Sequence, residues 1–176
     1  TIGLAAIGKF EMAKVGGYLA AQLAGGIAGA VLVWLMYLPH WNETNDAGAI
    51  RGSFCTGPAI PHLTGNLISE VIGTFVLMLG VLAVITPGNL VPNSGLQEAI
   101  SPALVGVIVF SIGLSLGGAT GYAINPARDL GPRIAHAILP IRHKGDSSWS
   151  YSWVPIIGPI LGAVLAAFTY QSLWPK

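Results

Sequence analysis

Long apolar segments alternate with shorter polar ones along this chain of 176 residues. Four runs contain no charged side chain, and they cover residues 15–38, 71–97, 99–127 and 153–175. A helix needs roughly 20 apolar residues, at about 1.5 Å of rise each, to cross the hydrocarbon core of a bilayer. The pattern therefore predicts four membrane-spanning helices, over residues 15–38, 66–86, 99–116 and 153–174.

Composition narrows the class of protein further. Hydrophobic residues make up 53% of the chain, charged residues only 9%, and the formal net charge is +1. A soluble domain has about 25% charged residues, because its surface is in contact with water. The composition excludes a soluble enzyme, a nucleic-acid-binding protein and a disordered chain. We expect an all-α membrane protein embedded in a lipid bilayer.

The third apolar run contains residues that a membrane-spanning helix does not tolerate. After Leu116 the chain passes three glycines and Pro126 before it reaches its next charge at Arg128. Lipid cannot satisfy the backbone polar groups of a broken helix, so such a segment occurs only inside protein or beside a water-filled cavity. Residues 117–125 are therefore expected to form irregular backbone at membrane depth. This expectation indicates a pore.

The sequence Asn-Pro-Ala-Arg-Asp at residues 125–129 has the features of a helix start. Asn125 is a strong N-cap residue, Pro126 suits the first helical position, and Asp129 favours the positive end of the helix dipole. A short helix is predicted from Pro126 to about Ala137, with its N-terminus inside the membrane. Such a terminus repels cations and protons. The side chains of Asn125 and Arg128 would donate hydrogen bonds to a passing solute.

These residues resemble the second signature loop of the aquaporin (major intrinsic protein) family. An Asp after the Arg is typical of its glycerol-conducting branch, the aquaglyceroporins or glycerol uptake facilitators. Three longer strings resemble that branch as well: GYAINPARDLGPR at residues 121–133, FCTGPAIPH at 54–62 and SEVIGTF at 69–75. The resemblance extends over essentially the whole chain.

The resemblance implies an aquaporin-like right-handed helical bundle with re-entrant half-helices, in a single transmembrane domain over residues 1–176. In that scheme residues 1–10 are the remnant of the first half-helix, and residues 117–137 are the second re-entrant loop and half-helix. The four predicted spans are then the third to sixth. The first two spans and the first Asn-Pro-Ala motif are missing, so we expect the domain to be truncated at its N-terminus. The family forms homotetramers, and we expect multi-pass insertion in the plasma membrane.

The resemblance also assigns roles to individual residues. Each is an expectation carried over from the family pattern: Gly113, Tyr122 and Arg128 as selectivity filter; Asn125, Pro126 and Ala127 as constriction; the carbonyls of Ala119, Thr120 and Gly121 as acceptor track; Glu70 and Asp129 as structural support. Glu70 lies inside a predicted span, where carboxylates are costly and find partners in the bundle. The alternative role of Glu70 is a proton relay. The alternative role of Arg128 is an ion pair with Asp129.

The expected function is a passive channel for glycerol, water and other small neutral solutes. No cofactor, no enzymatic activity and no nucleic-acid partner are expected. Two alternatives stay open, a secondary transporter with a broken-helix binding site and a non-conducting channel fragment. An intramembrane enzyme would need a nucleophile or metal cluster that the sequence does not suggest. The four histidines are His40, His62, His136 and His143. They lack metal-ligand spacing, and most of them are expected in solvated loops.

Two glycine pairs have the GxxxG spacing of close helix contacts. They are Gly25 with Gly29 and Gly158 with Gly162. We expect both pairs to serve tight packing inside the bundle.

Overall fold

The computed structural model describes residues 1–86 and 95–174, and all regular secondary structure in those ranges is helical. The elements in chain order are α1 (Ile2–Ala6), α2 (Met12–Met36), α3 (Leu38–Glu43), α4 (Ala47–Gly52), α5 (Leu63–Ile85), α6 (Leu96–Leu116), α7 (Pro126–Ile138), the 3-10 turn η1 (Trp149–Tyr151) and α8 (Val154–Leu173). The predicted all-α class is confirmed.

Four of these segments are long and apolar enough to cross a membrane. They are Met12–Met36, Leu63–Ile85, Ala99–Leu116 and Trp149–Leu173. At about 1.5 Å per residue their lengths are about 27 to 37 Å, close to the thickness of the hydrocarbon core. Each overlaps one predicted span, and the helix ends differ from the predicted ones by at most a few residues.

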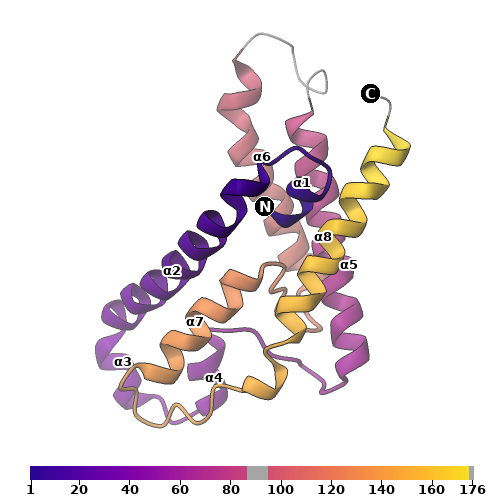
Figure 1. Cartoon of the computed structure of the whole chain (residues 1–176). Coiled ribbons are helices and arrows are strands. Elements are labelled where there is room, and N and C mark those ends of the chain that lie inside the picture. Colours follow the sequence, from indigo (N-terminus) through magenta and orange to yellow (C-terminus); the bar gives the residue numbers. More distant parts are fainter. Residues whose placement is uncertain (87–94, 175–176) are drawn as a thin grey trace.

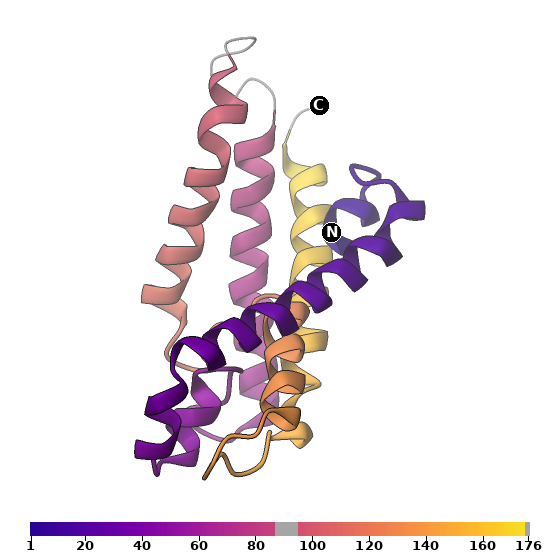
Figure 2. The ribbon, with the colours of Figure 1, turned by 90° about the vertical axis from the view of Figure 1, so that its left-hand side faces the viewer.

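The long helices form one bundle around the short ones. Figure 2 shows α5, α6 and α8 side by side, while α2 crosses at a slant. The short helix α7 lies between α2 and α8, and α1 packs against α8 near the other end of that helix (Figure 1). Two short helices, α1 and α7, are thus held against the inner sides of long ones.

Glycines allow the closest of these helix contacts. A Cβ atom on Gly158 would lie 2.6 Å from the Glu70 Cβ, and one on Gly162 would lie 2.3 Å from the Val71 carbonyl oxygen. Any side chain there would force α8 away from α5. The predicted packing role of this glycine pair is confirmed.

The other pair, Gly25 and Gly29, faces open space within the described chain, so its predicted packing role is not seen. The neighbouring Gly26 makes the contact between α2 and α7 instead. A Cβ atom on Gly26 would lie 2.8 Å from the Ala127 carbonyl oxygen, and one on Gly131 would lie 3.0 Å from the Leu23 carbonyl oxygen.

The segment between α2 and α5 contains two short helices, α3 and α4. The Asp46 side chain accepts hydrogen bonds from the backbone amides of Gly48 and Ala49, which caps α4. Apolar side chains then fix this segment on the bundle, in a cluster that includes Trp41, Ile50 and Phe54. The same cluster takes in α2 and α7 through Ala30, Ala135 and Leu139.

The expectation of a solvated His136 is wrong. Helix α7 extends to Ile138, and the His136 ring is fully buried against the Phe54 ring, with 5.5 Å between ring centroids. Its Nδ1 atom lies 2.8 Å from the Ser147 hydroxyl. The half-helix ends at Ile138, within one residue of the predicted end at about Ala137. The Lys144 ammonium donates to three carbonyl groups there, those of His136, Ala137 and Leu139.

Candidate pore and selectivity site

The segment between α6 and α7 is irregular, as its glycines predict. It begins with a turn in which the Gly121 amide donates to the Gly117 carbonyl. Three residues then have left-handed backbone angles, with φ of 81° at Gly121, 43° at Tyr122 and 45° at Ile124. Such angles are unusual for residues other than glycine, and those at Tyr122 and Ile124 cost roughly 1 to 3 kcal/mol each. The surrounding structure must therefore hold this loop in place.

Glu70 of α5 holds one side of the loop. Its Oε1 atom accepts hydrogen bonds from the Thr120 hydroxyl at 2.6 Å and the Ala123 amide at 2.9 Å. Its Oε2 atom accepts one from the Ile124 amide at 2.8 Å. The side chain is only 1% exposed, so these three donors replace the water that a buried carboxylate loses.

The Glu70 contacts also orient the carbonyl groups of the loop. In a planar trans peptide the N–H and C=O bonds point in opposite directions, and no cis peptide occurs in the described ranges. Because the amides of Ala123 and Ile124 point at Glu70, the carbonyls of Tyr122 and Ala123 point away from it. Sequence reasoning did not name these two acceptors. The carbonyl of Ala119, which it did name, already accepts the Ala59 amide at 3.0 Å.

Asn125 caps α7 as predicted from its position before Pro126. Its Oδ1 atom accepts the Ala127 amide at 2.8 Å, and its backbone is extended. Because the oxygen faces the helix, the side-chain NH₂ group is the part of Asn125 that remains available to a solute. The residue is exposed in the described chain.

A cavity of about 220 Å³ lies beside this cap. It is lined by Asn125, Pro126 and Ala127 together with side chains from α1, α2, α5 and α8, most of them apolar: Leu4, Leu19, Leu77, Met78, Val81 and Ile160. The lining is therefore mostly hydrocarbon, with polar groups from Asn125, Thr1, Gln22 and Thr74.

Arg128 and Asp129 do not pair with each other. The Asp129 carboxylate binds Arg133 instead, through Nε to Oδ1 at 2.8 Å and Nη2 to Oδ2 at 3.0 Å, and both side chains are fully buried. Arg128 is exposed and makes no hydrogen bond or ion pair with any residue in the part of the chain that the structure describes. Sequence reasoning missed Arg133, although its spacing of four from Asp129 is that of a helical ion pair.

Gly113 and Tyr122 are brought together at the end of α6. A Cβ atom on Gly113 would lie 3.1 Å from Cζ and 3.3 Å from the hydroxyl oxygen of Tyr122. One on Gly117 would lie 2.8 Å from Cδ1 of the same ring. Because neither position has a side chain, the Tyr122 ring can lie against the backbone of α6.

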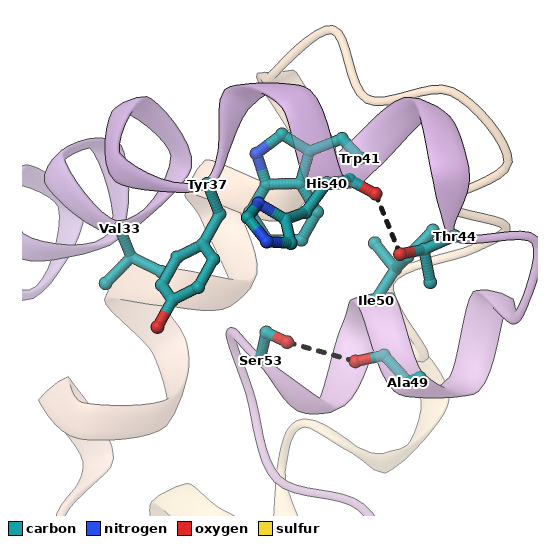
Figure 3. Close-up of a pocket in the computed structure, with 8 residues that line it drawn as sticks. All are labelled: Val33, Tyr37, His40, Trp41, Thr44, Ala49, Ile50 and Ser53. Atoms are coloured by element: carbon teal, nitrogen blue, oxygen red, sulfur yellow. Dashed lines mark hydrogen bonds between the residues drawn. The ribbon is translucent and has the colours of Figure 1, made fainter.

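A second pocket, of about 430 Å³, lies at the far end of α2 and is shown in Figure 3. Its lining comes from α2, α3 and α4 and from the residues that join them: Val33, Tyr37, His40, Trp41, Thr44, Ala49, Ile50 and Ser53. None of the predicted site residues lines it. The candidate site therefore comprises the end of α6, the re-entrant loop, the start of α7 and the cavity beside them.

Comparison with known proteins gives a consistent result. The family model "Major intrinsic protein" matches residues 1–170. A probable glycerol uptake facilitator protein of Thermotoga maritima is 57% identical over 174 residues, which are 99% of this chain and 71% of the relative. Glycerol uptake facilitator protein 3 of Lactiplantibacillus plantarum is 56% identical over 173 residues, 98% of this chain and 69% of the relative.

Among solved structures, the X-ray structure of the aquaglyceroporin from Plasmodium falciparum superposes with a TM-score of 0.82 at 31% sequence identity. The match covers 98% of this chain and 69% of that one. The helices, the re-entrant loop and the sequence matches agree, and the chain belongs to the major intrinsic protein family.

Proposed function

We propose that this chain forms the wall of a passive transmembrane channel for glycerol, water and other small neutral solutes. One observation supports the proposal: at the start of α7, Asn125 lines a cavity walled mostly with hydrocarbon, and both Asn125 and Arg128 are exposed with donors that no described residue uses. The relatives named as glycerol uptake facilitators support glycerol as the solute.

The arrangement suits a polyol because the two sides of its path differ. Donors come from the Asn125 amide and the Arg128 guanidinium, and acceptors come from the carbonyls of Tyr122 and Ala123. A row of hydroxyl groups can bind along this edge, while the C–H side of the polyol lies against the apolar wall. Each hydrogen bond to the protein replaces one to water, so the solute enters without a large desolvation cost.

Ions are excluded by the same arrangement. The N-terminus of α7 carries a partial positive charge, and Arg128 adds a full one close by. A cation meets this positive potential, and the described lining offers few oxygen atoms to replace its hydration shell. We place the filter at Gly113, Tyr122 and Arg128, with Asn125 as the constriction, and we expect a homotetramer in the plasma membrane.

A swelling assay tests the proposal. Vesicles that contain the intact protein should shrink in hyperosmotic glycerol and then swell again quickly, whereas in sorbitol they should only shrink. Protein-free vesicles are the control for the slow permeation of glycerol through lipid. Equal responses to glycerol and sorbitol would remove the glycerol assignment.

The alternative of a secondary transporter makes a different prediction. It requires saturable uptake coupled to an ion gradient, and Glu70 is the only carboxylate within a predicted span that could couple protons. All three Glu70 contacts are with the re-entrant loop, which favours a structural role. Glycerol flux that rises in proportion to concentration, with no change under a proton gradient, supports the channel.

A further inference from the structure

A short piece of the segment between α4 and α5 touches the re-entrant segment. The Ala59 amide donates to the Ala119 carbonyl at 3.0 Å. Thr56 lies against the next part of the loop, because a Cβ atom on Gly121 would be 3.4 Å from the Thr56 Cβ. Residues 56–59 and Glu70 therefore hold the irregular backbone from two sides.

Thr56 also binds the first turn of α7. Its backbone amide and its hydroxyl both donate to Oδ2 of Asp129, at 2.8 and 2.7 Å. Thr56 is only 6% exposed, and hydrogen bonds to a buried carboxylate are among the stronger ones in proteins. The same residue thus contacts Gly121, which precedes Tyr122, and Asp129, which follows Arg128.

Arg133 completes the arrangement around Asp129. Its Nη2 atom donates to the Thr56 carbonyl at 2.9 Å as well as to Asp129. Its Nη1 atom donates to the carbonyls of Ser147 and Ser148, at 2.6 and 3.1 Å. The first turn of α7 is therefore tied to two loops, and the buried positive charge is compensated by Asp129 and three carbonyl oxygens.

The consequence concerns Arg128. Its side chain has no partner of its own in the described chain, so only the backbone next to it fixes where the guanidinium lies. That backbone is held by Asp129, and Asp129 is held from outside its own helix by Thr56. A change at Thr56 would therefore alter the spacing between Arg128 and Tyr122 without touching either residue.

We propose that Thr56 is a positioning residue that sets solute discrimination: its hydroxyl fixes Asp129, and thereby the separation of Arg128 from Tyr122. This inference rests on the proposed function, since it assumes that these two residues face the solute. It adds a residue 72 positions away from Arg128 in the sequence to those that determine which polyols pass.

The test is the substitution Thr56→Val, which keeps the shape of the side chain and removes the hydroxyl. The measured quantity is the ratio of glycerol to erythritol permeability in vesicles that contain the intact protein. We expect the ratio to fall by roughly threefold to tenfold, a change no larger than the net contribution of one ordinary hydrogen bond. A purely structural role would lower both permeabilities together and leave the ratio unchanged.

Two controls make the result specific. Thr56→Ser keeps the hydroxyl and should retain the wild-type ratio. Thr44→Val removes a hydroxyl from the same segment between α2 and α5. That hydroxyl donates to the His40 carbonyl in the pocket of Figure 3, and its loss should not change the ratio. If Thr56→Val does not accumulate, Thr56→Ala removes the same hydroxyl with a smaller side chain and is measured instead.

The outcomes separate the two proposals. A wild-type protein that passes no glycerol contradicts the proposed function itself. A wild-type protein that passes glycerol, with an unaltered ratio in Thr56→Val or Thr56→Ala, overturns the role of Thr56 alone.

Discussion

Replacing Glu70 by glutamine should release the re-entrant loop. The glutamine has one acceptor atom where the carboxylate has two, and its NH₂ group takes the place of the other oxygen. If the NH₂ group stands at Oε1, the Ala123 amide loses its acceptor, while the Thr120 hydroxyl can rotate to accept. If it stands at Oε2, the Ile124 amide loses its acceptor. In either orientation one buried backbone amide faces another donor.

The size of the effect follows from these contacts. A buried donor without a partner costs about 1 to 3 kcal/mol, and the remaining hydrogen bonds lose the contribution of the charge, which is about 1 kcal/mol more. The total of about 2 to 4 kcal/mol lowers the equilibrium constant of the ordered over the relaxed loop by roughly 30-fold to several hundredfold. The left-handed angles at Tyr122 and Ile124 are then free to relax, because residues 56–59 hold the loop only at Ala119 and Gly121.

Thermal unfolding in detergent and vesicle permeability measure this prediction together. Glu70→Gln should unfold at a lower temperature and pass less glycerol per protein than wild type. Glu43→Gln removes the same charge from an exposed side chain at the end of α3 and is the matched control. Glu70→Gln behaving like Glu43→Gln in both assays would refute the reasoning. Normal stability with loss of proton-driven flux alone would favour the relay.

Two further predictions concern the selectivity filter and the C-terminal end of α7. Gly113→His should reduce glycerol permeability more than water permeability. The new Cβ atom would lie 3.1 Å from the Tyr122 ring, and the imidazole would displace that ring or enter the path of the solute. An unchanged permeability ratio in the swelling assay would contradict the placement of the filter. Burial and, after it, the charge of Lys144 lower the pKa of His136. Below about pH 6.5 the unfolded chain therefore binds a proton that the folded chain does not, and the free energy of unfolding should fall as the pH drops. Thermal unfolding between pH 5 and 8 measures this, and His136→Asn should remove the dependence if the assignment holds.

The local sequence was sufficient to predict the long helices and the start of α7. Charge-free runs longer than the bilayer thickness have few alternatives to a spanning helix, since lipid satisfies no backbone group. Asn125 and Pro126 defined the first turn of α7 because capping depends on neighbouring residues alone, and the structure has that cap. The glycines after Leu116 likewise predicted that the helix ends there, and α6 does end at Leu116.

The contacts around the candidate site depended on tertiary structure. Asp129 could be predicted to favour a helix start, yet its partner Thr56 lies 73 residues away, and no periodicity connects them. His136 was expected in water because its neighbours are charged, whereas packing against Phe54 buries it. A sequence pattern reports interactions within about one helical turn. Which distant donor satisfies a buried charge is decided only when the helices pack, because the desolvated carboxylates of Glu70 and Asp129 must be compensated by whatever groups the fold brings next to them.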